Sequence, residues 1–88
     1  MLLKDKAGII TGASKGIGRA IAIGLVAEGG KITVNYHLSE QAADDVLSQI
    51  NNLGGTAYKF RADVSKKLEV EEMVAFTLKM FGKIDFLE

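Results

Sequence analysis

The chain has 88 residues, the length of one small domain, and its 11 basic residues balance its 11 acidic ones, so neither nucleic acid nor an anionic membrane is expected as a partner. The absence of cysteine excludes disulfides and thiolate chemistry, and the single histidine, His37, cannot build a zinc site alone. No apolar run approaches the ~18 residues of a membrane-spanning helix and the N-terminus lacks a signal peptide's apolar stretch, so a cytoplasmic location is expected by default.

The first predicted unit is a strand, a glycine-rich turn and a helix. Residues 7–10 are mostly apolar and lead into the run Thr11-Gly12-Ala13-Ser14-Lys15-Gly16-Ile17-Gly18. Residues at helical spacing follow, and Gly29-Gly30 is expected to end this helix before a second strand, Lys31 to Tyr36. The helical residues are Ile17, Ala20, Ile21, Gly24, Leu25 and Glu28.

The glycine-rich turn has the features of a phosphate site. Glycines at 12, 16 and 18 allow positive φ and let the backbone lie close to a ligand. Free amides at the start of the helix, together with the helix dipole, favour an anion there. The strand, turn, helix and second strand form one βαβ unit of roughly 30 residues, as a mononucleotide-binding fold requires. A tight turn without a ligand is the alternative.

Two further helices are predicted. Ser39 is a candidate N-cap for the first of them, which should end at Gly54-Gly55, and its apolar face comprises Ala43, Val46, Leu47, Ile50 and Leu53. Ser65 is a candidate cap for the second, which Gly82 should end, and its buried face comprises Val70, Met73, Val74, Thr77, Leu78 and Phe81.

A third strand, Thr56 to Arg61, lies between these helices, and a fourth begins at Ile84. Strand and helix therefore alternate along one domain, residues 1–88, with no linker. This order predicts an α/β fold with a parallel sheet covered by helices.

The sequence resembles the N-terminal part of a short-chain dehydrogenase/reductase. The spacing Thr11-Gly-x-x-x-Gly-x-Gly matches that family's cofactor signature, and four further segments fall where the family has similar residues: Asn35-Tyr36, Gly54-Gly55, Asp63-Val64 and Phe81 to Asp85. Within the family, the sequence most resembles 3-oxoacyl-carrier-protein reductases and glucose 1-dehydrogenases. The resemblance implies a partial, doubly wound Rossmann fold with three helices and about four parallel strands in the order 3-2-1-4.

The resemblance also implies a set of cofactor-binding residues. Those around the pyrophosphate and the adenosine ribose would be Gly12, Ser14, Gly16, Ile17 and Gly18, with Thr11 at the end of the preceding strand. The Asp63 carboxylate would accept from the adenine amino group, and the Val64 N–H would meet a ring nitrogen. A position beyond a strand's carboxyl end suits ligand binding; the alternative for Asp63 is a turn or capping carboxylate. Thr11 could simply bond the local backbone.

The end of the second strand indicates which nicotinamide cofactor is used. A carboxylate there would favour NAD, whereas this chain has Tyr36, followed by His37 where NADP-specific relatives often carry arginine. Lys15 adds a cation on the same side, so NADP is favoured over NAD. Because a histidine is only partly charged near neutral pH, its contribution should be smaller than arginine's. Both side chains could instead be solvated surface groups.

The catalytic tyrosine of the family, which is followed four positions later by lysine, has no equivalent here. Glu40 stands four residues after Tyr36, and Ala62 stands four residues after Tyr58. The chain also ends within the predicted fourth strand, so we expect a truncated piece of a longer protein, either cut deliberately or left by an interrupted gene.

The chain is therefore expected to be an NAD(P)-binding half-domain without activity of its own, which self-associates through the exposed fourth-strand edge. One alternative is an enzyme part that a separate C-terminal chain completes. Another is a structural module with a vestigial phosphate turn.

Overall fold

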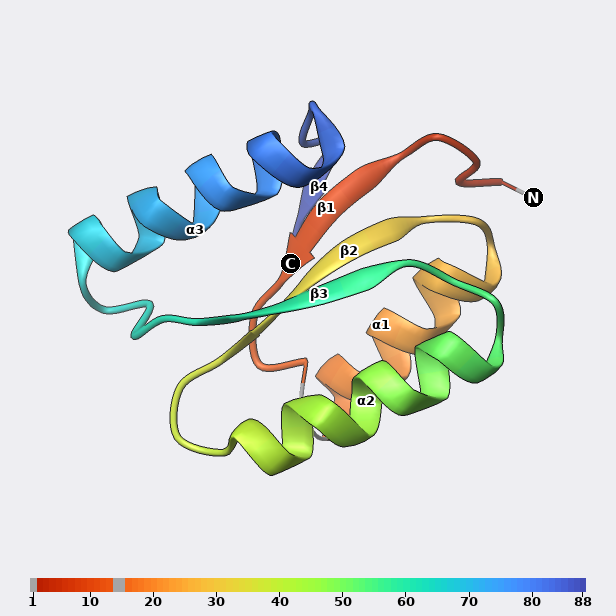
Figure 1. Ribbon diagram of the computed structural model, residues 1–88, viewed down its shortest axis with the longest axis horizontal. Helices are drawn as coiled ribbons and strands as arrows, with labels where there is room; N and C mark the ends of the chain where they lie inside the picture. Colours follow the sequence, from red (N-terminus) through yellow and green to blue (C-terminus); the bar gives the residue numbers. More distant parts are fainter. Residues whose placement is uncertain (1, 14–15) are drawn as a thin grey trace.

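The computed structural model describes residues 2–13 and 16–88 and contains a parallel sheet with helices on both faces (Figure 1). The elements in chain order are β1 (Ala7–Ile10), α1 (Gly16–Ala27), β2 (Lys31–Tyr36), α2 (Glu40–Asn52), β3 (Ala57–Arg61), α3 (Lys67–Phe81) and β4 (Phe86–Leu87). The strand order β3-β2-β1-β4 confirms the predicted α/β fold, its three helices and the order 3-2-1-4. All pairings between neighbouring strands are parallel.

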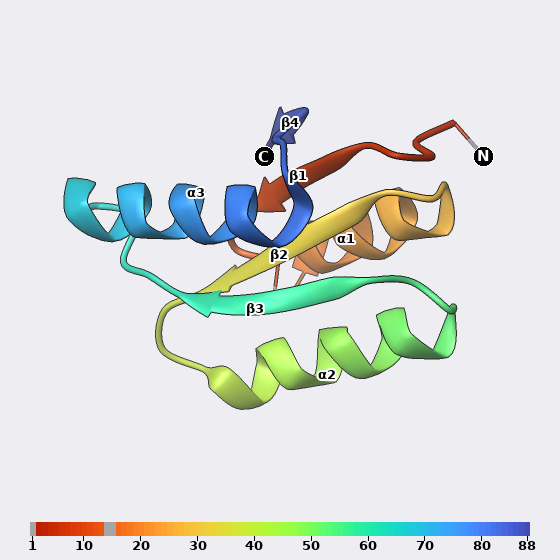
Figure 2. The ribbon, with the colours of Figure 1, turned by 45° about the horizontal axis from the view of Figure 1, so that its top comes forward.

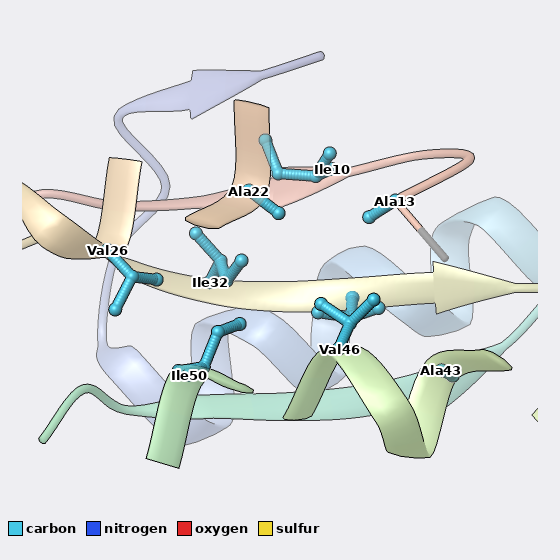
Figure 3. Packing of buried hydrophobic residues seen from close by; sticks show 9 residues of the cluster. Ile10, Ala13, Ala22, Val26, Ile32, Ala43, Val46 and Ile50 are labelled. Atoms are coloured by element: carbon cyan, nitrogen blue, oxygen red, sulfur yellow. The ribbon is translucent and has the colours of Figure 1, made fainter. Parts of the chain in front are cut away.

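The larger core lies between the sheet and the pair α1 and α2. Its buried side chains come from β1, the turn that follows it, β2 and both helices: Ile10, Ala13, Ala22, Val26, Ile32, Val34, Ala43, Val46 and Ile50. Figure 3 shows the packing of this cluster between the sheet and the two helices. The smaller core, on the opposite face, joins Ile9 and Ala62 to Met73 of α3. Figure 2 shows that helices cover both faces of the sheet, with α3 on one side and α1 and α2 on the other. Among the described residues, none of the helices is both long and apolar enough to span a bilayer.

Most of the predicted helix ends are confirmed. The Ser39 hydroxyl accepts a hydrogen bond from the Ala42 N–H at 3.2 Å and caps α2. Gly82 takes a left-handed conformation with φ of 80° and ends α3, as a C-terminal glycine cap does. The predicted Ser65 cap is wrong, because the residue at that position is Lys66 and no side chain caps α3. Ser65 instead donates its hydroxyl to the Asp63 carboxylate.

Three further predictions need correction. Leu53 and Leu78, which were expected on the apolar faces of α2 and α3, are 53% and 45% exposed. The helix α1 is confirmed, but Ala22 and Val26 are its buried residues, while Ile17 is 80% exposed and Ile21 36% exposed. The small side chain of Ala22 fits closely against the sheet, whereas the larger isoleucines lie on the face that nothing in the described structure covers. The fourth strand begins at Phe86 rather than Ile84, since Asp85 uses its side chain and its N–H to bond both polar groups of Ala7 before the ladder starts.

Candidate functional site

The carboxyl ends of β1, β2 and β3 lie at the same edge of the sheet, and the predicted site residues follow these strands (Figure 1). In an open parallel sheet this edge is where ligands bind. Three connections leave it: the glycine turn after β1, the segment around His37 after β2, and the segment around Asp63 after β3. The candidate site is built from these three connections.

Of the three glycines expected to allow positive φ, Gly12 and Gly16 adopt it and Gly18 does not. Gly12 and Gly16 both have φ of 62°, a left-handed conformation that side chains with a Cβ adopt at a cost, and an added Cβ would meet no atom within 4 Å at either glycine. Gly18 differs, because its Cβ would overlap the carbonyl oxygen of Gly12. The turn therefore folds back on the first turn of α1 and leaves open space on its outer side. Ser14 and Lys15 lie outside the described residues.

Thr11 lies where β1 ends and bonds the neighbouring strand. Its N–H and its hydroxyl both donate to the carbonyl oxygen of Glu88, at 2.7 Å and 2.8 Å. The alternative of a backbone-bonding threonine is thus realised, but toward β4 and not within its own turn. Ile17 follows in α1, where its 80% exposed side chain is available to a ligand or a partner.

The two residues that end β2 lie in different environments. Tyr36 is half-buried, and its hydroxyl reaches the Glu40 carboxylate only at 3.4 Å. His37 is exposed, and its Nε2 lies 3.8 Å from Asp63 Oδ2, so the structure brings these two predicted site residues together.

Asp63 forms a tight turn with Ser65. The Oδ1 atom of Asp63 accepts the Ser65 hydroxyl at 2.7 Å and the Ser65 N–H at 2.9 Å. These two hydrogen bonds, with smaller help from the charges of His37 and Lys66, hold the pKa of Asp63 below its usual value. The alternative of a turn carboxylate is therefore realised through Oδ1, whereas Oδ2 faces His37 and can accept from a ligand. The side chain of Val64, beside it, is 53% exposed.

Two residues shape this edge without having been predicted to do so. Asn35 is 4% exposed, and its amide Nδ2 donates to the carbonyl oxygens of Ala62 at 3.1 Å, Tyr36 at 3.3 Å and Phe60 at 3.4 Å. It therefore links the ends of β2 and β3. Arg61, the last residue of β3, donates Nε to the His37 carbonyl oxygen at 3.2 Å. The sequence does indicate Asn35 as unusual, because it is a polar residue inside the apolar run of β2. Nothing in the sequence of β3 indicates a role for Arg61.

An apolar hollow of about 330 Å³ opens beside the ends of β1 and β4, under α3. Its lining includes Ile9, Met73, Val74, Val64 and Leu87. Leu87, in β4, is 63% exposed. This side of the site thus presents hydrophobic surface, in contrast to the polar side formed by His37 and Asp63.

Comparisons with known proteins agree with this architecture. Residues 6–88 match the family model described as short chain dehydrogenase. A 3-oxoacyl-[acyl-carrier-protein] reductase from Synechocystis is 42% identical over 85 residues, which are 97% of this chain and 34% of that protein. The chain thus spans about a third of the length of the curated relatives it matches.

Solved structures are similar over nearly the whole chain. A short chain dehydrogenase from Burkholderia cenocepacia in complex with NADP has a TM-score of 0.94 and 34% identity, covering 99% of this chain and 36% of that one. A 7α-hydroxysteroid dehydrogenase complexed with NADH has a TM-score of 0.91 and 36% identity, covering 97% and 33%. From the family model, the identities and the shared fold, we conclude that this chain belongs to the short-chain dehydrogenase family.

Proposed function

We propose that residues 1–88 form a half-domain that binds the adenosine and phosphate groups of NADP(H), in preference to NAD(H). The observation that carries the proposal is the glycine turn, where two left-handed glycines leave room for a ligand and Gly18 packs against Gly12 at the start of α1. This geometry fits a phosphate held by backbone N–H groups at a helix N-terminus. In a full-length protein of this family, the bound cofactor would exchange hydride with a carbonyl or alcohol substrate.

Each residue has a proposed role at the edge of the sheet. The glycine turn with Ser14, Ile17 and Thr11 would surround the pyrophosphate and ribose. Asp63 Oδ2 would accept from the adenine amino group, since Oδ1 is already bonded to Ser65. The Val64 N–H would donate to an adenine ring nitrogen. Lys15 and a protonated His37 would favour the 2′-phosphate of NADP. An acidic residue in place of Tyr36 would repel that phosphate.

Calorimetric titration with NADPH, NADH, ATP and AMP tests the proposal. We expect NADPH to bind more tightly than NADH, and Gly16→Ala to weaken both. Gly54→Ala is the matched control, because Gly54 also has a positive φ, of 76°, and open space around a Cβ, but lies at the opposite edge of the sheet. Equal affinities for NADPH and NADH would contradict the NADP preference, and equal affinities of the two variants would contradict the site.

We further propose that the 88 residues bind the cofactor without turnover. The described site contains groups for adenosine and phosphate, and the sequence has no tyrosine with a lysine four positions later to move a proton beside a nicotinamide. A purified sample should therefore leave NADPH absorbance at 340 nm unchanged with carbonyl compounds. Consumption that depends on Asp63 would refute this. Activity that appears only with a C-terminal fragment of a relative would show that the chain is an enzyme part needing a second chain.

Self-association through β4 is a second proposal, supported by the open edge of that strand. Within residues 2–13 and 16–88, β4 pairs only with β1, and its exposed Leu87 adjoins the apolar hollow. An unpaired strand edge is a site for pairing with a second copy. Sedimentation velocity should show a dimer that Leu87→Asp weakens, whereas Leu2→Asp, at an 86% exposed position on the N-terminal segment, should not. A monomer at high micromolar concentration would refute the proposal.

A further inference from the structure

Arg61 lies at the polar side of the candidate site, although it is separated from it in the sequence. It is the last residue of β3 and pairs in register with Tyr36, the last residue of β2. Its side chain reaches the connection that follows β2, where Nε donates to the His37 carbonyl oxygen at 3.2 Å. A guanidinium group is therefore held against the main chain of His37, which is proposed above to favour the 2′-phosphate.

The charge of Arg61 is available to a ligand. Within the described part of the chain, Arg61 takes part in no salt bridge, and the hydrogen bond to His37 uses Nε and leaves both Nη groups. Lys59, two residues earlier on the same face of β3, differs because its ammonium lies 2.8 Å from Glu40 Oε2 and 2.6 Å from Asp44 Oδ1. A guanidinium stays ionised at any physiological pH and can present two N–H groups to one phosphate.

The acidic groups nearby are already engaged. Asp63 Oδ1 accepts two hydrogen bonds from Ser65, and its Oδ2 faces His37. The carboxylate of Glu40 is bonded to Lys59. A phosphate beside His37 would therefore meet carboxylates whose charge is partly offset, together with one cation, Arg61, that has no carboxylate within salt-bridge distance in the described structure.

We propose that Arg61 is a specificity-determining residue that binds the 2′-phosphate of NADP(H), supplying from β3 the permanent positive charge that His37 provides only when protonated. This inference rests on the proposed nucleotide site. The ribose 2′ position of a bound dinucleotide is expected next to the end of the second strand. There, the His37 carbonyl fixes one side of the guanidinium and the Nη groups bind the phosphate.

Calorimetry with 2′,5′-ADP and 5′-AMP isolates this contact, because the two ligands differ only in the 2′-phosphate. Arg61→Ala should weaken binding of 2′,5′-ADP roughly five- to tenfold, as expected for an exposed charge-assisted hydrogen bond, and leave 5′-AMP unchanged. Arg61→Lys should keep part of the preference. Lys79→Ala, in the last turn of α3, removes the same charge away from the site and should change neither affinity.

The outcomes separate this inference from the proposed function. If the unmodified chain prefers 2′,5′-ADP and Arg61→Ala keeps that preference, the role of Arg61 is refuted while the NADP site stands. If the unmodified chain binds both ligands equally, the NADP preference and the role of Arg61 both fail while the nucleotide site stands; if it binds neither ligand, the nucleotide site fails as well. Equal weakening of both ligands would show that Arg61 only orders the His37 segment, and would overturn the inference. Should Arg61→Ala fail to fold by circular dichroism, Arg61→Gln replaces it, with the same expected loss.

Discussion

Two glycines of α1 allow the geometry of the glycine turn to be tested with one type of substitution. Gly18 faces the turn, and its Cβ would overlap the Gly12 carbonyl oxygen and lie 2.9 Å from the carbonyl carbon. Gly24 lies two turns later in the same helix, where an added Cβ would have no atom within 4 Å outside the helix's own backbone. Gly18→Ala and Gly24→Ala should therefore change stability in opposite directions.

The expected magnitudes follow from helix propensity and from overpacking. Replacing an interior helix glycine by alanine raises the free energy of unfolding by about 0.5–1 kcal/mol. Gly24→Ala should therefore raise the melting temperature by about 4 °C. At Gly18 the same gain is opposed by an overlap with backbone that a rotamer change cannot relieve, which costs about 1–3 kcal/mol. The net effect of Gly18→Ala should be a loss of about 1–2 kcal/mol in the free energy of unfolding, or roughly 4–16 °C in melting temperature.

Urea and thermal unfolding, followed by circular dichroism at 222 nm, measure both variants. Nucleotide titration should also show weaker binding for Gly18→Ala, because the turn must move away from α1 to make room for the methyl group. Gly24→Ala should bind as the parent does. If Gly18→Ala were as stable as Gly24→Ala and bound nucleotide normally, the close packing of Gly12 on α1 would not exist, and the argument for a built phosphate turn would be refuted.

Three other measurements test interactions in the core and at the carboxyl edge. The hydroxyls of Thr33 and Thr77 are fully buried and 2.8 Å apart. Thr77→Val should therefore lower the free energy of unfolding in urea by about 1–3 kcal/mol, and adding Thr33→Val should restore most of that loss. Two additive losses would refute the pairing. Asn35→Asp would place a carboxylate among three carbonyl oxygens, which raises the pKa of that carboxylate in the folded state. The variant should be destabilised at neutral pH and should regain stability as the pH falls toward the pKa of about 4 that an aspartate has in the unfolded chain. A solvated carboxylate would not show this trend. Because Ser65 lowers the pKa of Asp63 in the folded state, the carboxylate stabilises the fold above its unfolded pKa, and this contribution is lost as the pH falls through the folded pKa. NMR titration of Ser65→Ala should show the pKa of Asp63 raised toward its usual value. An unchanged pKa would contradict the turn.

The fold could be predicted from the sequence because its signals are local. Apolar runs, helical spacing and glycines at helix ends depend on a few neighbouring residues, and β2, α2 and the end of α3 lie close to where these signals place them. The packed side of α1 was harder to predict. Most of its residues are apolar or small, so Ile17 and Ile21 fit a helical stripe as well as Ala22 and Val26 do, and only contact with the sheet decides between them.

The site was predictable in its residue types and less so in its contacts. The glycine spacing and Asp63 can be identified along the chain, but the short distance between His37 and Asp63 arises because β2 and β3 are adjacent. Arg61 gave no signal for the same reason, since its contact with the His37 carbonyl depends on strand register. Ser65 was misassigned as a cap because a hydroxyl two residues after an aspartate can bond that carboxylate as readily as a helix N–H.

If the proposed nucleotide site is correct, the contacts at the carboxyl edge also predict which part of a dinucleotide the chain should recognise. Asn35 and Arg61 join the ends of β2 and β3 through main-chain carbonyl groups, so the residues proposed to meet adenosine are held in place without a ligand. On the other side of the sheet edge, β1 is flanked by the two-residue strand β4 and by the apolar hollow, and we assign no described residue there to the nicotinamide. The affinity for 2′,5′-ADP should therefore lie within a few-fold of that for NADPH. A much tighter binding of NADPH in the same calorimetric titration would show that the nicotinamide half is recognised as well, and would refute a site limited to the adenosine end.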